Sequence, residues 1–419
     1  MKNLRLKLSL LFSQGLMVII FFMLTMPLKA QFQWDEVAIM PRGAILLSAE
    51  TVGDRIYVMG GLLSISLPSD SVYAFNPADN TFVTREHIPE VLGASATAVL
   101  NGKIYLFGGV KSSLGQTTPN CYVYDPAIDE WGTLADMSVS RAYAVAETVG
   151  EKIYIIGGIG SLGVPMYNIV EEYDPLTNTF VTKNPMPTSR GYMASEVLNN
   201  QIYVMGGLLW PENISLDEVE IYDPATNAWT IGVDLPTPRL GLAAGLLGNT
   251  IYTVSGFDTN PYYDVPNVEG YTEGSGWLTY DSLPYPVHGL AVAAFGDSLY
   301  AFGGLNLDNT FVEDEVYVFH SGSVGLSDNY GVFPLLGQNF PNPFSERTSI
   351  SLKLAAGARI EMGMYDINGK LVRLLVKAYH PAGSYFYRIE ADNLPDGMYF
   401  CRLRLNGEFQ VSRKMVLLR

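Results

Sequence analysis

The sequence predicts an all-β protein with a sixfold repeat followed by a smaller β-domain, and three observations lead to this class. A glycine pair recurs at spacings of 48, 49, 49, 49 and 48 residues. Turn sequences separate short apolar runs within each repeat, and the pattern changes after Phe319. A fixed period near fifty residues indicates repeated units that bury a shared core. The glycines at these positions are Gly60, Gly61, Gly108, Gly109, Gly157, Gly158, Gly206, Gly207, Gly256, Gly303 and Gly304.

Each repeat contains four strand-like segments. In the third repeat these segments are 142–149, 153–156, 170–173 and 180–182. Asn-Gly, Gly-Asp and Asp-Pro sequences lie between such segments. They favour tight turns, since they supply a positive φ or the fixed φ of proline where the chain reverses. The run before each glycine pair is apolar on both faces, and the glycines allow backbones to approach closely. Four antiparallel strands in each of six repeats predict a six-bladed β-propeller over residues 31–324.

The two ends of the repeat region predict how the ring closes. The sixth repeat lacks an outer strand after Phe319, whereas Trp34–Met40 has the pattern of an outer strand with no repeat before it. We therefore expect a strand at about residues 33–40 to complete the last blade. This pairing would remove an exposed strand edge at that point.

Charge and cysteine content narrow the classes of function. Residues 31–327 hold 34 acidic and 10 basic side chains, a balance of −24, whereas residues 328–419 hold 8 and 12, a balance of +4. The acidic main body argues against nucleic acid as a partner, because phosphates would be repelled. Cys121 and Cys401 are the two cysteines, and we place them in different domains. The sequence therefore predicts no disulfide framework and no cysteine metal site, and we expect no cofactor.

The first thirty residues have the pattern of a signal peptide. Lys2, Arg5 and Lys7 precede an apolar run over 16–26, and a small residue, Ala30, stands before the expected cut. The apolar run is shorter than the roughly twenty residues that span a bilayer. We therefore expect residues 1–30 to be removed and the mature chain to leave the cytoplasm.

The repeated residues carry a family resemblance. Each of the first four repeats combines the glycine pair with a downstream Tyr-Asp-Pro or its variant, as at Tyr222-Asp223-Pro224, and most have an aromatic residue such as Trp229 after it. This combination resembles the kelch repeat and covers roughly residues 34–319. Asn76-Pro77 replaces Asp-Pro in the first copy, Ser255-Gly256 replaces the glycine pair in the fifth, and the last two copies lack Tyr-Asp-Pro. The resemblance implies a six-bladed kelch propeller.

Three arginines are candidates for ligand binding. Arg141, Arg190 and Arg239 each stand sixteen residues before the glycine pair, or its Ser-Gly equivalent, of their repeat. Two hypotheses remain open at this point. The arginines could form an anion-binding arc near the channel mouth. Alternatively, each could bond backbone carbonyls or acids such as Glu147 and Glu196 and tie the blades together.

The loops that follow the glycine pairs are the expected ligand-binding face, because variable loops on a rigid scaffold commonly carry binding. These loops contain aromatic residues suited to sugar rings or protein side chains. The candidates are Tyr167, Trp210, Tyr262 and Tyr263. Acid clusters at Asp217-Glu218 and Glu313-Asp314-Glu315 match no recognised calcium loop. We expect a solvated acidic rim there and no metal.

Catalysis has little support in the sequence. No nucleophile elbow, His-Glu-x-x-His motif or phosphate loop is present. We therefore expect a non-catalytic module that binds a glycan or a protein. The alternative is a carbohydrate-active kelch enzyme such as a sialic acid mutarotase, which by resemblance is also six-bladed and exported and would need arginines for a carboxylate.

The chain ends in a second predicted domain. A polar linker is expected over 325–336, and alternating residues such as 348–354 follow it. Turn sequences at Asp366-Ile367-Asn368-Gly369 and around Pro395-Asp396-Gly397 separate further strand-like runs. This pattern predicts a small immunoglobulin-like β-sandwich over 337–419.

The same tail resembles the type A C-terminal sorting domain of the type IX secretion system. The match begins at Gln338-Asn339-Phe340-Pro341-Asn342-Pro343-Phe344 and runs in order to the last residues. The residues that carry it are Asn339, Pro341, Asn342, Pro343, Gly369, Gly383, Gly397 and Lys414. The resemblance implies recognition by the outer-membrane translocon and its sorting peptidase. It also implies delivery to the cell surface or the medium, with removal of the tail and attachment to a surface glycolipid in some relatives.

Overall fold

The computed structural model is all-β in its described part. It describes residues 34–64, 66–161, 164–260, 262–307, 312–320, 335–336, 339, 342, 344–354, 357–366, 369–381, 383–392, 394–406 and 408–419. The expected signal peptide at 1–30 lies outside these residues, as does most of the expected linker. Within the described ranges, no helix is long and apolar enough to cross a membrane.

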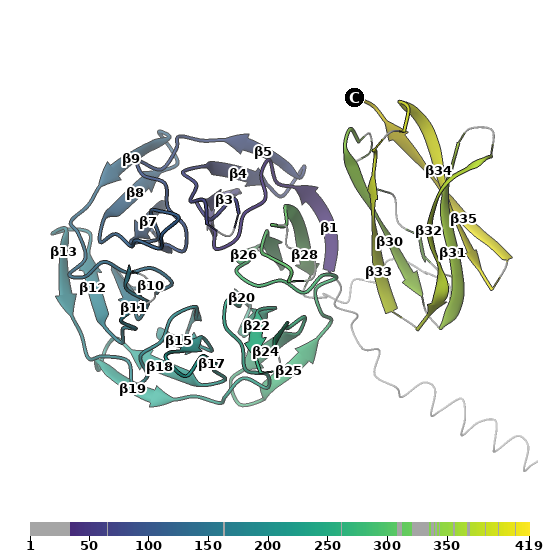
Figure 1. Ribbon diagram of the computed structural model, residues 1–419. Helices are drawn as coiled ribbons and strands as arrows, with labels where there is room; N and C mark the ends of the chain where they lie inside the picture. The colour runs from purple at the N-terminus through teal and green to yellow at the C-terminus, as the bar shows by residue number, and fades with distance from the viewer. Residues whose placement is uncertain are drawn as a thin grey trace, which may run out of the picture.

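Six four-stranded antiparallel sheets form a ring, which confirms the predicted propeller (Figure 1). Blade one contains β2 (Ser48–Val52), β3 (Arg55–Met59), β4 (Val72–Asn76) and β5 (Thr81–Thr84). Blade two contains β6 (Ala96–Leu100), β7 (Lys103–Phe107), β8 (Cys121–Asp125) and β9 (Glu130–Thr133). Blade three contains β10 (Val145–Val149), β11 (Lys152–Ile156), β12 (Val170–Asp174) and β13 (Thr179–Thr182).

The other half of the ring adds two small hairpins to the same plan. Blade four contains β14 (Ala194–Leu198), β15 (Gln201–Met205), β18 (Val219–Asp223) and β19 (Ala228–Ile231), with the hairpin β16 (Leu208–Leu209) and β17 (Ile214–Ser215). Blade five contains β20 (Ala243–Leu247), β21 (Thr250–Val254), β24 (Val268–Thr272) and β25 (Gly276–Tyr280), with the hairpin β22 (Phe257–Thr259) and β23 (Tyr262–Asp264). Blade six contains β26 (Ala291–Phe295), β27 (Ser298–Phe302), β28 (Glu315–His320) and β1 (Trp34–Ile39).

Blade six joins the two ends of the ring. β1 pairs with β28 antiparallel, and Trp34 lies opposite Phe319 with ring centroids 5.2 Å apart. Trp34 is only 2% exposed, so the N-terminal strand contributes to the core between blades five and six. The apolar contact and the strand pairing together hold the first and last repeats side by side.

The core lies between neighbouring blades and explains the repeated aromatic residues. Tyr222 of β18 is fully buried and contacts Trp229 of the outer strand, with centroids 5.0 Å apart. It also meets Tyr154 of the preceding blade, at 5.8 Å. The second strand of each blade is buried on both faces, as its apolar run predicts. Each blade therefore completes its own core only against its neighbours.

The glycine pairs are required by close backbone contact at the blade junctions. Gly108 has a φ of +60°, and a Cβ there would lie 2.3 Å from the carbonyl oxygen of Arg141. The next amide, that of Gly109, donates a hydrogen bond to the same oxygen at 3.0 Å. A side chain at Gly108 would therefore push blades two and three apart.

The C-terminal domain is a sandwich of two sheets. One sheet contains β29 (Leu335–Leu336), β30 (Arg347–Leu354) and β33 (Gly383–Glu390). The other contains β32 (Leu371–His380), β31 (Ala358–Asp366), β34 (Gly397–Leu405) and β35 (Glu408–Leu417). β29 pairs with β30, so Leu335 and Leu336 belong to this sandwich. The expected linker boundary at residue 336 is therefore corrected.

The tail motif braces the last strand of the sandwich. The side chain of Asn342 donates to the carbonyl of Lys414 at 3.0 Å and accepts from the amide of Val416 at 2.8 Å. Asn339 is buried and its amide donates to the Thr348 hydroxyl at 2.9 Å. Gly369 and Gly397 have positive φ angles, and Gly383 begins β33. Pro341 and Pro343 lie outside the described residues.

Candidate functional site

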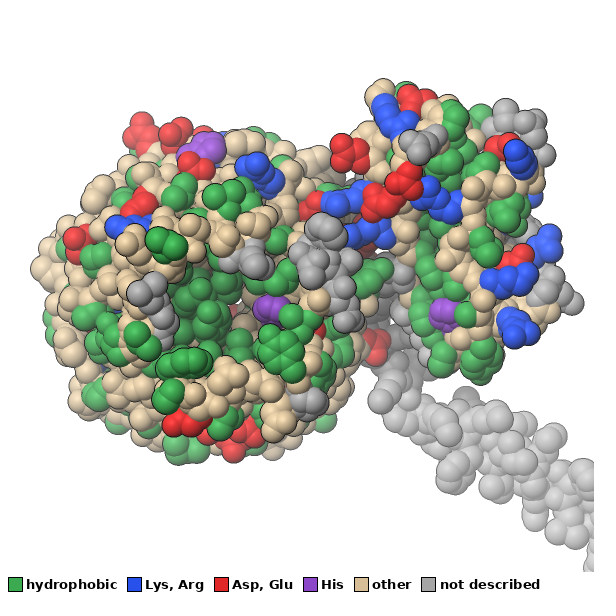
Figure 2. Space-filling view, in the orientation of Figure 1, with side chains coloured by type: hydrophobic (Ala, Val, Ile, Leu, Met, Phe, Trp, Pro, Cys, Tyr) green, Lys and Arg blue, Asp and Glu red, His purple; other side chains and the backbone are tan. Residues whose placement is uncertain are grey.

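A cavity of about 330 Å³ opens on the loop face, at the mouth of the central channel. Figure 2 shows hydrophobic side chains gathered around the hollow in the middle of the propeller. The residues that line it come from every blade except blade two and are largely apolar or aromatic. We call this cavity the loop-face pocket, and its central lining residues are Tyr143, Tyr192, Asn213, Phe257, Tyr262 and His288.

The floor of the loop-face pocket is a closed ring of backbone hydrogen bonds, one residue from each blade. The ring runs through Leu46, Ala94, Tyr143, Tyr192, Gly241 and Gly289, and each amide donates to the preceding carbonyl over 2.6–3.1 Å. All six residues have φ between 54° and 64°. Residues with a Cβ rarely adopt this conformation, so the ring holds four side chains in a strained backbone. Five of the six ring residues, all except Ala94, line the pocket, and most of the residues that directly follow the ring residues line the channel below.

Two tyrosines of the ring form one aromatic wall. The rings of Tyr143 and Tyr192 have centroids 3.9 Å apart and an interplanar angle of 30°. Burial raises the pKa of both phenols, so they remain neutral hydrogen-bonding groups over the physiological range. A rigid aromatic surface of this kind suits a ligand that has an apolar face.

The opposite wall contains a histidine held by an aspartate. Nδ1 of His288 lies 2.7 Å from Oδ1 of Asp264, and the Leu307 amide donates to Oδ2 at 2.7 Å. The His288 ring also lies 5.4 Å from Phe257 between centroids. Asp264 occupies Nδ1 of His288. The other ring nitrogen, Nε2, is therefore the one that a ligand would contact. Sequence reasoning gave this pair no role, because its two residues lie 24 positions apart in no known motif.

Two hairpins position the predicted loop aromatics. The amide of Ser215 on β17 donates to the Thr259 hydroxyl on β22 at 3.0 Å, which joins the hairpins of blades four and five. Tyr262 is 71% exposed, lines the pocket and packs against Phe257 at 4.5 Å. Trp210 and Tyr263 are exposed on the same two hairpins but outside the pocket lining, and Tyr167 is half-buried in blade three.

The three candidate arginines are structural, so the anion-binding arc does not fit this geometry. Arg141, Arg190 and Arg239 have fully buried side chains. In blade four, Arg190 donates to the carbonyls of Gly206 and Glu218, both at 3.0 Å, and to the carboxylate of Glu220 at 3.0 Å. Burial lowers the pKa of each arginine and its acidic partner raises it. None of these three guanidinium groups is exposed to a ligand.

The acidic partners of these arginines were missed by sequence reasoning, which suggested Glu147 and Glu196. The true partners are Glu171, Glu220 and Glu269, each thirty residues after its arginine. We call each pair an arginine–glutamate clamp. A signal was present: repeats without the arginine have a tyrosine in place of the glutamate, and these are Tyr73, Tyr122 and Tyr317. The two positions change together from repeat to repeat.

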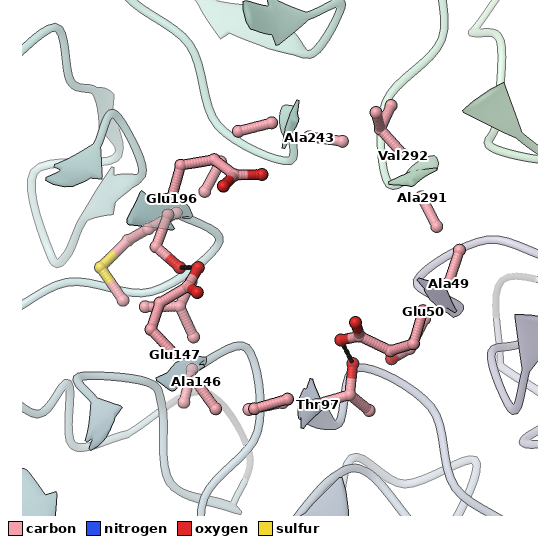
Figure 3. Close-up of a pocket in the computed structure, with 18 of the residues that line it drawn as sticks. Ala49, Glu50, Thr97, Ala146, Glu147, Glu196, Ala243, Ala291 and Val292 are labelled. Carbon is pink, nitrogen blue, oxygen red and sulfur yellow. Dashed lines mark hydrogen bonds between the residues drawn. The ribbon is translucent and has the colours of Figure 1, made fainter. Parts of the chain in front are cut away.

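A second cavity of about 480 Å³ occupies the channel beneath the ring. Figure 3 shows that Glu50, Glu147 and Glu196 point into it, whereas the matching positions of the other blades carry small residues. The Thr97 hydroxyl donates to Glu50 at 2.7 Å, and the Ser195 hydroxyl donates to Glu147 at 2.7 Å. These two bonds link Glu50 and Glu147 each to a residue of the next blade around the channel.

Burial raises the pKa of the channel carboxyls. The values reach about 7 for Glu50 and Glu147, where hydrogen bonds from Thr97 and Ser195 act in the opposite direction. The pKa of Glu196 is raised well above its ordinary value by burial and by the two other glutamates. Among the described residues, no group of three acids, histidines or cysteines is placed to hold a metal.

The acidic residues expected to form a solvated rim at 313–315 are paired instead. Arg388 of the C-terminal domain forms ion pairs with Glu313 and Glu315, and Arg347 pairs with Asp314. That expectation was wrong because the second domain covers this end of β28. Cys121 and Cys401 are both buried and free, and burial raises the pKa of each thiol to about 12.

Comparison with known families decides which repeat this is. The KLHDC2/KLHL20/DRC7 Kelch-repeats domain model matches residues 47–264, which is just over half of the chain. The chain belongs to the kelch-repeat family. A second model, the Secretion system C-terminal sorting domain, matches residues 338–418. Both resemblances are confirmed, and the tail indicates export and interaction with the type IX secretion machinery.

Individual relatives of this kelch protein match it only in part. "Kelch-like protein terF" of Aspergillus terreus is 34% identical over 97 residues, 22% of this chain and 21% of the relative. "Kelch-like protein 33" of Homo sapiens is 31% identical over 111 residues, 26% of this chain and 20% of the relative. The chain thus spans about a fifth of the length of these curated relatives. Among solved structures, the "Structure of YjhT" has a TM-score of 0.58 at 17% identity, covering 66% of this chain and 95% of that one, and supports the fold.

Proposed function

We propose that this exported kelch propeller is a binding module that takes a glycan in the loop-face pocket. The observation that carries the proposal is that one cavity is lined by the aromatic wall of Tyr143 and Tyr192, by the exposed Tyr262 and by His288. Aromatic rings pack against the apolar faces of sugars, and their hydroxyls, the histidine and Asn213 bond the hydroxyl groups. The cavity volume of about 330 Å³ is at the small end for ligand pockets, which favours one or two sugar units.

The proposed site of action is the cell surface or the surrounding medium. The sorting domain supports this location, since its match covers nearly all of residues 337–419. In this proposal the translocon and its sorting peptidase are partners of the tail, and attachment to a surface glycolipid follows removal of the tail. A surface-exposed glycan is then the ligand that the propeller meets first.

The glycan proposal is tested on the full chain with a glycan array followed by titration calorimetry of the strongest hit. Tyr262→Ala should weaken binding at least about tenfold, because an exposed aromatic contact is removed from the pocket. Tyr379→Ala is the matched control, since this tyrosine is 67% exposed on β32 of the sorting domain. Equal affinity of the wild type and Tyr262→Ala would exclude the pocket, and capture of only a protein ligand would favour the protein-binding alternative.

A second candidate is the carbohydrate-active enzyme, such as a sialic acid mutarotase. The pair of His288 and Asp264 favours it, because a histidine fixed by a carboxylate can move a proton to or from a bound sugar. This alternative first relied on the three arginines to bind the carboxylate of a substrate, and all three are buried. Anomer interconversion followed by NMR should be accelerated by the wild type and slowed by His288→Gln; a rate equal to that in buffer excludes catalysis.

A further inference from the structure

The two domains of the chain carry opposite charge where they meet. The propeller region at 31–327 has a balance of −24, and residues 328–419 have a balance of +4. Figure 2 shows basic and acidic side chains facing one another between the propeller and the sandwich. Opposite potentials favour association and orient two surfaces before they touch.

Two arginines of the sorting domain make the contacts. Arg388 lies on β33 and pairs with Glu313 at 2.9 Å and with Glu315. Arg347 begins β30 and pairs with Asp314. Glu313 and Glu315 are only 7% and 3% exposed, so these pairs are better shielded from water than ordinary surface ion pairs. Shielded charge-assisted bonds of this kind are stronger than exposed ones.

The acidic residues surround the seam at which the propeller closes. Glu315 of β28 lies opposite Ile39 of β1, and the Met40 amide donates to the carbonyl of Asp314 at 2.6 Å. Glu36 of β1 belongs to the same surface, with both carboxylate oxygens shielded from solvent. Burial raises the pKa of Glu36 to about 7, while Ser349, Arg388 and Arg347 of the sorting domain act in the opposite direction. We call Glu36, Glu313, Asp314 and Glu315 the acidic seam.

We propose that the acidic seam is a docking surface for the chain's own sorting domain, which acts as a removable clamp on the closing strand. Arg347 and Arg388 fix the start of β28, where Glu315 lies opposite Ile39 of β1, while the precursor is exported. Removal of the tail takes away both arginines, and the mature propeller then presents four carboxylates at its seam. This role is separate from ligand binding in the loop-face pocket, so it stands or falls independently of the proposed function.

The docked sorting domain leaves its other sheet uncovered. Both arginines come from the sheet of β29, β30 and β33, which faces the propeller in Figure 1. The sheet of β32, β31, β34 and β35 lies on the far side, and its outer residues Leu374 and Tyr379 are 50% and 67% exposed. Docking on the propeller therefore leaves this sheet of the sandwich accessible.

The test uses the full chain with a protease site inserted between residues 321 and 334. After cleavage, the two domains of the wild type should elute together from a gel-filtration column at about 20 mM salt and separate at about 500 mM, because salt screens ion pairs. Arg347→Glu with Arg388→Glu should separate them at low salt. Arg404→Glu with Lys377→Glu changes the charge equally on the far sheet and should leave them together.

A second measurement reports on the seam without cleavage. Amide hydrogen exchange in β1 should be about tenfold faster in the Arg347→Glu, Arg388→Glu variant than in the wild type, while exchange in β14 stays unchanged. Adding Glu315→Arg to Arg388→Glu should restore slower exchange. Separation of the wild-type domains at low salt would overturn the docking surface, and equal exchange in β1 would overturn the clamp.

Discussion

The six blades fall into two groups that differ at one pair of matching positions. Blades three to five place a buried ion pair there, whereas blades six, one and two place an apolar residue and a tyrosine. In the first group a buried arginine meets a glutamate thirty residues later, as in Arg190 and Glu220. In the second group an apolar residue meets a tyrosine, as in Leu92 and Tyr122 of blade two. Both groups form the same four-stranded sheets and the same junction to the next blade.

This difference shows that the arginine–glutamate clamp is one of two ways to fill the same buried position beside the glycine pair. The arginine satisfies carbonyls at the glycine pair, such as that of Gly206, and needs a buried carboxylate to balance its charge. The apolar solution has no charge to balance. Blade six belongs to the apolar group, and its nearby acids meet arginines supplied by the sorting domain instead.

The largest expected effect comes from removing one partner of a clamp. Arg190→Ala leaves the carboxylate of Glu220 buried without its counter-charge, and the free energy of unfolding should fall by about 3–5 kcal/mol. Urea denaturation followed by tryptophan fluorescence measures this loss. A change below about 1 kcal/mol would show that the clamp does not stabilise blade four.

The double variant Arg190→Leu, Glu220→Tyr is the matched control, because it gives blade four the residues of blade two. Replacing a buried ion pair by apolar residues of similar volume is often neutral. The stability should therefore return to within about 2 kcal/mol of the wild type. If the double variant is as unstable as Arg190→Ala, the two chemistries are not interchangeable and the comparison between the groups fails.

The fold was predictable from the sequence because scaffold residues repeat in register. The spacing of Gly157 and Gly206 predicted the blades, and the unmatched strand beginning at Trp34 indicated how the ring ends meet. The sorting domain was recognisable because its residues match a known pattern in order. These features depend on local turns and periodic burial, which a sequence displays directly.

The candidate site was less predictable because it is assembled across blades. Tyr262 was expected on the loop face. Nothing in the sequence distinguishes Tyr143 and Tyr192 from other residues of the repeat, and only the structure shows their ring centroids 3.9 Å apart in one pocket. Glu50 and Glu147 stand 97 positions apart at the same position of the repeat, but the sequence does not show that this position faces a shared channel. The charge of Arg190 suggested a ligand, whereas its burial could be known only from the packing.

An intermediate effect on stability is expected from the channel carboxyls, which are present in three of the six blades. The pKa of Glu50 and of Glu147 is about 7 in the folded protein, and that of Glu196 is raised well above 4.5. The folded state therefore holds protons that the unfolded chain has lost, so stability falls as pH rises from about 4.5 to about 7. Unfolding free energy should be lower at pH 8 than at pH 5 by on the order of 1–3 kcal/mol.

Changing all three glutamates to glutamine should flatten this pH dependence and raise stability at pH 8. The control is Glu130→Gln, which removes a carboxylate from the exposed outer strand β9 and should leave the slope unchanged. Thermal unfolding across the pH range measures both. An unchanged slope in the triple variant would show that the channel carboxyls are charged in the folded protein.

The smallest effect tests contacts between neighbouring outer strands. The side-chain oxygen of Asn178 accepts hydrogen bonds from the Tyr173 hydroxyl at 2.8 Å and from the Ala135 amide of blade two at 2.9 Å. Asn80 occupies the matching turn of blade one with a similar φ, 59° against 52°, but its side chain accepts no bond from another blade among the described residues. Both variants to alanine lose the left-handed preference of asparagine, so the difference between them isolates the hydrogen bonds. Asn178→Ala should cost about 1–2 kcal/mol more than Asn80→Ala in urea denaturation; equal losses would mean that the blades are held by their cores alone.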